Sequence, residues 1–121
     1  MKKLLVIISM FASISASATN WIAPTHGASE YIDIDSMTYL DTGHTMRSAW
    51  LKIEGANGRV DLTRIEVYCP GRMIRYPVNH VYVNGVFVDT TYYNSTWDYV
   101  VPSSLAHNWS NTVCLNKVKA Q

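Results

Sequence analysis

The sequence predicts an α+β fold, with one antiparallel β-sheet of about six strands and a C-terminal α-helix packed on it and tied to it by a disulfide. Residues 60–69 alternate apolar and polar side chains, which is typical of a strand with one buried face. Turn-forming residues separate several such runs, and the segment after Ser104 has helical spacing instead. The two cysteines, Cys69 and Cys114, end the alternating strand and follow the helical segment.

The N-terminus has the pattern of a secretory signal peptide. Two lysines precede an apolar run at residues 4–12, and Ala16-Ser17-Ala18 supplies the small residues that signal peptidase requires. We expect cleavage after Ala18, so that residues 1–18 are the signal peptide and residues 19–121 form a single domain.

The same segment bears on membrane anchoring. Its apolar run is about half of the roughly 20 residues that a transmembrane helix needs. No cysteine stands at the cleavage site to carry a lipid. We therefore expect a mature chain with no transmembrane or lipid anchor, located in a bacterial periplasm or secreted.

The charge of the chain argues against one class of partner. The full chain carries a net charge of +1, and the signal peptide holds two lysines and no acid. A nearly neutral mature surface disfavours non-specific nucleic-acid binding, which needs clustered Lys and Arg. Two close basic pairs, Arg72 with Arg75 and Lys117 with Lys119, are interpreted as solvated surface charge.

An exported chain with two cysteines enters an oxidising compartment, where a disulfide forms and persists. A Cys69–Cys114 bridge over this separation would stabilise the domain by roughly 4 kcal/mol. Two free thiols or a redox site are the alternatives. They lack support, because the chain has no Cys-x-x-Cys and no basic residue beside Cys114.

The first elements are short. Residues 21–23 are apolar and predict a strand lead-in, and residues 31–34 predict a strand that stops at a turn at Asp35-Ser36. Asp33 and Asp35 have the spacing that opens an EF-hand calcium loop. The glycine and glutamate that such a loop needs later are absent, so we predict no metal there.

Residues 45–54 predict a long strand that a turn at residues 55–58 joins to the strand at 60–69. Ala49 and Leu51 point to one side, and Trp50 points to the nominally polar side. A tryptophan there indicates either that other parts of the chain cover this face or that it contacts a partner, so the sequence permits a monomer or a dimer.

Pro70-Gly71 predicts a turn into a return strand, with a bulge where the alternation changes phase at Pro77. Asn84-Gly85 predicts a two-residue type I′ hairpin. Its expected register pairs side chains across the two strands as Tyr82 with Phe87, Val81 with Val88, and His80 with Asp89.

The last part of the chain combines an irregular segment and a helix. Residues 90–98 predict an irregular or edge segment with three exposed aromatic residues, Tyr92, Tyr93 and Trp97. Ser103 or Ser104 then caps a helix that is expected to end near Val113, with Cys114 at its edge or just beyond. The apolar stripe of this helix is Ala106, Trp109 and Val113.

No grouping of residues predicts catalysis or cofactor binding. The four histidines lack the spacing that brings two imidazoles onto one metal ion. Ser104 and His107 lie one helical turn apart, and a cap residue with a surface histidine fits them better than a nucleophile and base. We therefore predict no catalytic residue, no metal and no cofactor.

Several short segments, in this order and spacing, carry a resemblance to a family: Tyr31-Ile32-Asp33, Asp35-Ser36-Met37, Ser48-Ala49-Trp50-Leu51, Val67-Tyr68-Cys69, Arg72 to Tyr76, Trp97, Val101-Pro102-Ser103 and Val113-Cys114. Together they resemble the surface-adhesin protein E family of small exported bacterial proteins. The resemblance implies an antiparallel sheet with a C-terminal helix fastened by a disulfide. It also implies adhesion to host extracellular-matrix proteins such as vitronectin and laminin, and it assigns no binding residue.

We therefore expect a non-enzymatic exported binding protein, adhesin-like in kind, with a protein partner. Tyr92, Tyr93 and Trp97 are the candidate binding residues, because aromatic side chains in a polar segment can anchor a partner. The alternative is that they only cover the sheet. A periplasmic inhibitor or immunity protein that binds an envelope hydrolase or toxin is the alternative function, and a small hydrolase is a third hypothesis.

Overall fold

The structure is a computed structural model that describes residues 20–119, so the predicted signal peptide lies outside the described residues. Within residues 20–119 the chain forms seven strands, a short 3-10 turn and one α-helix, α2. Their bounds are β1 Trp21–Ile22, β2 Glu30–Tyr39, β3 Met46–Glu54, η1 Ala56–Gly58, β4 Arg59–Tyr68, β5 Met73–Val83, β6 Val86–Tyr92, β7 Asp98–Tyr99 and α2 Leu105–Leu115.

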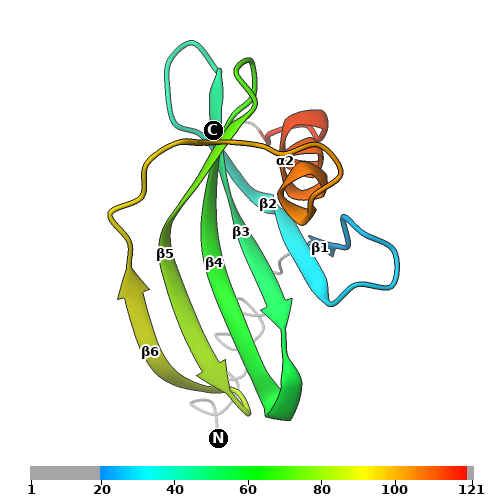
Figure 1. Cartoon of the computed structure of the whole chain (residues 1–121), viewed down its shortest axis with the longest axis vertical. Helices are drawn as coiled ribbons and strands as arrows, with labels where there is room; N and C mark the ends of the chain where they lie inside the picture. The colour runs from blue at the N-terminus through cyan, green and yellow to red at the C-terminus, as the bar shows by residue number, and fades with distance from the viewer. Residues whose placement is uncertain (1–19, 120–121) are drawn as a thin grey trace, which may run out of the picture.

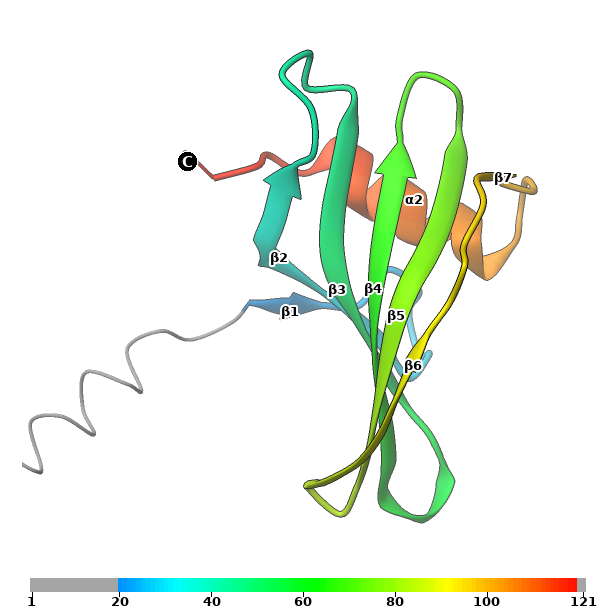
Figure 2. The same ribbon diagram turned by 90° about the vertical axis from the view of Figure 1, so that its left-hand side faces the viewer.

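The strands make one antiparallel sheet whose order follows the chain. Neighbours run from β1 to β6 in sequence order, and β7 pairs with β5 beyond the end of β6. Figures 1 and 2 show the resulting twisted sheet, with α2 on one face and the β3–β4 and β5–β6 hairpins extending beyond the helix. The predicted antiparallel sheet with one C-terminal helix is confirmed.

The core lies between the sheet and the helix. Ile32, Leu51, Ile65 and Val67 are fully buried on the face that α2 covers, which we call the helix-side face. The predicted stripe of the helix packs there, since Val113 is fully buried and Ala106 and Trp109 contact the core. The opposite face, here called the open face, carries Ser48, Trp50, Arg64, Glu66 and Arg75.

The turn predicted at Asp35-Ser36 is wrong. The strand runs on to Tyr39, and its pairing with β3 shifts register between Asp33 and Thr38. The local bonds that predicted a turn do form, because the Asp33 carboxylate accepts from the Asp35 N–H at 3.1 Å. The Ser36 hydroxyl oxygen also accepts from the Trp50 N–H at 3.1 Å, which keeps the chain beside β3 and turns the irregularity into a bulge.

The bulge predicted at Pro77 is confirmed, since the β4–β5 register shifts between the Arg64–Val78 and Glu66–Arg75 pairs. The hairpin at Asn84-Gly85 is also confirmed. Both residues have positive φ, at 51° and 81°, as a type I′ turn requires.

Only part of the predicted hairpin register is correct. Tyr82 pairs with Phe87, and their rings meet edge to face at 5.7 Å. Val88 is then an extra residue on β6, so Val81 pairs with Asp89 and His80 pairs with Thr90. The predicted pairs of Val81 with Val88 and of His80 with Asp89 are therefore wrong. His80 Nδ1 lies 2.7 Å from the Thr90 hydroxyl instead.

Ser104 is the N-cap of α2, and its hydroxyl accepts from the His107 N–H at 3.1 Å. The helix continues to Leu115, so Cys114 lies within its last turn, slightly further inside than expected. The Cys69–Cys114 disulfide is present, with the two Cα atoms 5.9 Å apart. No helix in residues 20–119 is both long enough and apolar enough to cross a bilayer.

Candidate functional site

A groove of about 700 Å³ lies on the helix-side face. Its floor comes from β3, β4 and β5, one wall is Trp109 of α2, and the other wall is the segment at residues 93–98. The lining residues combine aromatic rings, carboxylates and amides: Leu51, Ile53, Asp61, Thr63, Tyr76, Asn79, Tyr93, Asn94, Ser95, Thr96, Asp98 and Trp109. We call this feature the groove.

The groove lies where α2 stops covering the sheet. The helix crosses the strands (Figure 2), and the 10 residues of β4 extend for about 33 Å, well beyond the roughly 10–12 Å width of a helix. The helix contacts β2, β3 and β4, and its Trp109 ring also reaches Tyr76 of β5. The helix-side face therefore changes from apolar beneath α2 to polar where the groove begins.

A hydrogen-bonded network forms the polar part of the floor. The Thr63 hydroxyl donates to Asn79 Oδ1 at 2.8 Å, and Asn79 Nδ2 donates to Asp61 Oδ2 at 3.0 Å. Arg59, the first residue of β4, donates through Nε to Asp61 Oδ1 at 2.8 Å. The hydrogen bond from Arg59, with a further one from Asn79, lowers the pKa of Asp61, so this carboxyl is ionised at neutral pH.

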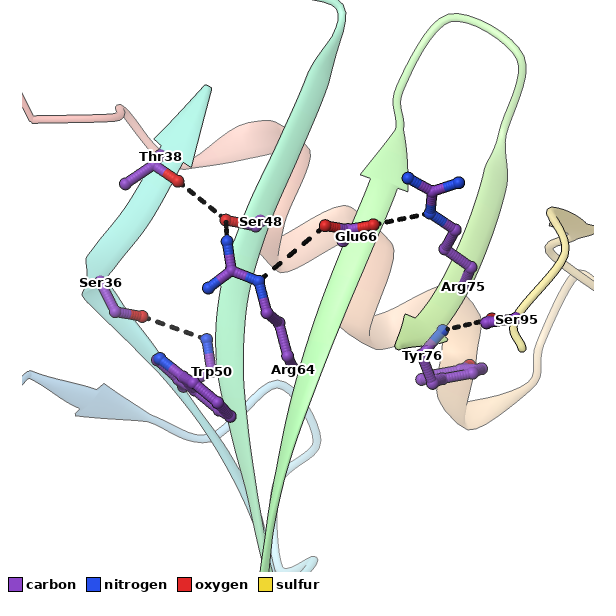
Figure 3. Close-up of polar contacts among 9 residues, drawn as sticks. All are labelled: Ser36, Thr38, Ser48, Trp50, Arg64, Glu66, Arg75, Tyr76 and Ser95. Carbon is purple, nitrogen blue, oxygen red and sulfur yellow. Dashed lines mark hydrogen bonds and ion pairs between the residues drawn. The ribbon is translucent and has the colours of Figure 1, made fainter. Parts of the chain in front are cut away.

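The aromatic part of the groove is held in place by the main chain and by ring contacts. Tyr76 and Trp109 meet edge to face, with their ring centroids 6.1 Å apart. The Trp109 indole donates to the buried Glu30 carboxylate at 3.2 Å. The Tyr76 N–H donates to the Ser95 hydroxyl at 3.0 Å, which fastens the wall segment to β5 (Figure 3).

Tyr76 also reports the electrostatic character of the groove. Burial raises the pKa of its phenol, and the negative charge of Asp98 raises it further. Asp98 itself is exposed at the rim. The groove thus places two carboxylates, Asp61 and Asp98, beside three aromatic rings. Among residues 20–119, no histidine, cysteine or lysine lines it.

The structure separates the three candidate binding residues. Tyr93 lines the groove and is 50% exposed. Tyr92 pairs with Val78, whose other neighbour is Arg64, so Tyr92 points to the open face. Trp97 also lies on the open face, because the Arg75 guanidinium stacks over its ring at 4.3 Å. One of the three residues therefore lies in the groove.

The open face is covered by its own long side chains. Arg64 donates to the Ser48 hydroxyl at 2.8 Å, and Glu66 accepts from Arg75 at 2.6 Å and lies 3.9 Å from Arg64 Nε (Figure 3). The Arg64 guanidinium lies 5.8 Å from the Trp50 ring. These contacts account for the partial burial of Trp50 without any helix on that face.

The side chains that suggested a calcium site or a serine nucleophile form other hydrogen bonds and ion pairs instead. His107 Nδ1 accepts from the Ser103 N–H at 2.9 Å, and the Ser104 hydroxyl donates to the Val101 carbonyl at 2.6 Å. Asp33 accepts main-chain bonds, and Asp35 pairs with Lys119 at 3.1 Å. No set of three or more His, Cys, Asp or Glu side chains in residues 20–119 is placed to hold a metal ion.

A second, small pocket of about 130 Å³ beside the disulfide is lined by both His107 and Ser110. The Ser110 hydroxyl donates to the main-chain carbonyl of His107 at 3.0 Å rather than to its ring. This is a bond within the helix, and it is not the geometry of a serine activated by a base.

The sequence contained one signal for the groove, in polar residues that continue an apolar period-two series. Asp61 and Thr63 lie in the same period-two series as the buried Ile65 and Val67. Polar residues that continue an apolar series indicate where a buried face becomes solvated. Asn79, Asp98 and Trp109 reach the groove from separate elements, and no local pattern links them to it.

Comparison with known proteins adds no relative to this description. No protein-family model, curated protein or solved structure matches the chain. Its membership of the surface-adhesin protein E family therefore stays a prediction from the resemblance.

Proposed function

We propose that this chain is a non-enzymatic exported binding protein, adhesin-like in kind, that holds part of a protein partner in the groove. The observation that carries the proposal is the groove itself. Its volume of about 700 Å³ falls within the roughly 300–1,000 Å³ of ligand sites. Aromatic rings with a few convergent polar groups are the usual lining of such sites.

The rim of the groove has free groups for recognition. Tyr93 is half exposed, and Asp98, in the same wall, is also exposed. Half-exposed tyrosines at concave sites are frequent anchors of protein interfaces, because they bury a large area at little entropic cost. The Tyr76–Ser95 hydrogen bond and the disulfide hold the two walls in position before a partner binds.

The partner class follows from the family resemblance together with export. Secretion and a disulfide suit a protein that works outside the cytoplasm. The resemblance directs the test to host matrix proteins, with vitronectin and laminin as the first probes.

The test compares two consecutive tyrosines that lie on opposite faces of the sheet. Tyr93→Ala removes a groove residue, and Tyr92→Ala removes an exposed residue outside the groove. We expect Tyr93→Ala to weaken binding of immobilised vitronectin or laminin by about 30-fold, the effect of losing an anchor worth about 2 kcal/mol. We expect Tyr92→Ala to stay within about twofold of the wild type. Surface plasmon resonance gives the affinities, and circular dichroism verifies the fold of each variant.

Equal affinities for the two variants would remove Tyr93 and the groove as the site. Unchanged binding after Tyr92, Tyr93 and Trp97 are all replaced by alanine in a folded variant would remove the three aromatic residues together. Absence of binding to both matrix proteins would contradict the adhesin-like function.

A second candidate function is a periplasmic inhibitor or immunity protein for an envelope hydrolase or toxin. The segment that leads into α2 favours it, since Tyr99, Val101 and the first helical residue, Leu105, are exposed and the disulfide fixes the helix. This function predicts that an envelope hydrolase or toxin co-purifies with the chain. Val101→Asp would abolish that association, whereas Tyr93→Ala would leave it intact.

A further inference from the structure

Strand β6 is an open edge of the sheet. It pairs with β5 on one side, and no described element pairs with its other side. Figure 1 shows β6 as the outermost strand, and Figure 2 shows it running free of the helix. The opposite edge differs, because β1 is only two residues long.

The side chains of β6 are apolar to an unusual degree for an exposed edge. Val86, Phe87, Val88 and Tyr92 are 65%, 53%, 57% and 80% exposed. Long apolar edge strands are aggregation sites that soluble proteins normally avoid with lysines, prolines or covering segments. Strand β6 contains neither lysine nor proline. The exposed apolar edge of β6 is therefore a candidate surface for pairing with another strand.

The main chain of β6 offers hydrogen-bonding groups to a further strand. The Tyr93 N–H donates to the Pro77 carbonyl at 3.0 Å, which defines a hydrogen-bonded pair just beyond β6. Antiparallel ladders alternate between bonded and non-bonded pairs. The N–H and C=O groups of Thr90 and Tyr92 therefore point away from β5, toward the free side.

One charge on the edge distinguishes between two possible occupants, a second copy of β6 and a segment of a different polypeptide. Asp89 is the only ionisable side chain at the exposed turn and edge of the hairpin, residues 84–91, and it lies at the middle of β6. Two copies of β6 paired over their full length would set Asp89 opposite Asp89, and like charges directly opposite destabilise a sheet. The Val88 bulge adds local twist that also disfavours flat self-pairing.

We propose that β6 binds an extended segment of a different polypeptide as an added antiparallel strand. That segment would place a lysine or arginine opposite Asp89 and apolar side chains beside Val86, Phe87 and Val88. Main-chain hydrogen bonds supply the attachment and the side chains supply the selectivity, as in other strand-addition complexes. This surface is independent of the groove, so it stands or falls separately from the function proposed above.

The test uses two blocked seven-residue peptides of alternating valine and threonine, one with a central lysine and one with a central glutamate. Amide NMR spectra of the purified chain follow each titration. We expect the lysine peptide to bind at least tenfold more tightly than the glutamate peptide, with the largest shifts in β6. We also expect hydrogen exchange of the Thr90 and Tyr92 amides to slow at least tenfold at saturation.

Asp89→Lys is the matched variant, because it lies on an exposed edge and should fold normally. It should reverse the preference, so that the glutamate peptide binds more tightly. A lysine peptide with prolines in place of the valines should not bind, since proline cannot donate to a ladder.

Three results would overturn the proposal. The first is equal affinity for the two charged peptides in wild type and variant. The second is a set of shifts confined to groove residues such as Tyr93. The third is a dimer, by light scattering, whose Thr90 and Tyr92 amides are already protected without peptide, because a second copy would then occupy the edge.

Discussion

Asp41 organises the turn between β2 and β3 through a single carboxylate. It accepts the N–H groups of Thr45 and Met46, each at 2.9 Å, and also the Thr45 hydroxyl. The hydrogen bond from the Thr45 side chain, followed by that from the Met46 N–H, lowers the pKa of Asp41. The carboxylate form is therefore the one that the folded turn stabilises.

The sign of the pH dependence follows from that shift. Because the folded pKa lies below the unfolded value of 3.8, this contribution to stability is present above the unfolded pKa. It is lost as the pH falls through the lowered folded pKa. We expect Asp41→Asn to lower the thermal unfolding midpoint at pH 7 and to lose most of that difference near pH 2.

Melting curves of the wild type and Asp41→Asn from pH 7 to pH 2 provide the measurement. Thr42→Ala, at an exposed position of the same turn, is the control and should leave the midpoint unchanged. A difference between wild type and Asp41→Asn that stays constant over the whole pH range would contradict the assignment.

Single residues also show where local rules reach their limit. The pattern at Asp35-Ser36 predicted the correct side-chain to main-chain bonds and the wrong consequence. The additional hydrogen bond from Trp50 to Ser36 comes from β3, a separate strand. Local chemistry thus indicates which groups bond, and the neighbouring strand decides whether the chain turns or bulges.

Among the elements, the turn of the β5–β6 hairpin was predicted correctly, but part of its strand register was predicted wrongly. Asn84-Gly85 determines the turn, because both positions need positive φ. Val88 then bulges, which shifts Asp89 and every later residue of β6 by one position. No turn residue marks this bulge in the sequence. It is nevertheless what separates Asp89 from His80.

Helix α2 is held to the sheet at its C-terminal end by Arg47 of β3. Arg47 Nη1 donates to the carbonyls of Val113 and Asn116 at 2.9 and 2.7 Å. These carbonyls lie at the negative end of the helix dipole, so a cation there is favourable. The Nε of Arg47 is buried and has no hydrogen-bond partner among the described residues, which offsets part of the gain.

We expect Arg47→Ala to lower the free energy of unfolding by about 2–3 kcal/mol, because two charge-assisted hydrogen bonds are lost. Arg47→Lys keeps the charge and should recover about half of this loss. Urea unfolding followed by tryptophan fluorescence measures both variants. A loss under about 0.5 kcal/mol for the alanine variant would show that the helix end does not depend on Arg47.

At the scale of the whole molecule, the Cys69–Cys114 disulfide ties the end of β4 to the last turn of α2. It spans 45 residues, and closing a loop of this length is worth roughly 4 kcal/mol in the chain-entropy model. That is a large fraction of the ~5–15 kcal/mol of net stability that such domains have. The disulfide therefore contributes a large part of the stability of this small domain.

Replacing both cysteines with alanine should lower the free energy of unfolding by about 4 kcal/mol. Chemical denaturation measures this change, and wild-type protein unfolded in excess reductant serves as the control. The reduced wild type should behave like the double variant. If the variant unfolds within about 1 kcal/mol of the oxidised wild type, the disulfide is dispensable to the fold.

The sequence by itself determined most of the strands, the hairpin turn and the capped helix, because each depends on periodicity or on residues close together in the chain. It also determined the disulfide, because the chain has only two cysteines. Only the tertiary structure decided where the helix stops covering the sheet. Helix α2 crosses only part of the length of the strands, so Asp61, Thr63 and Asn79 line a groove beside Tyr93 and Trp109 (Figure 2). The groove depends on the lengths and crossing of separate elements, and those long-range relations leave no local pattern in the sequence.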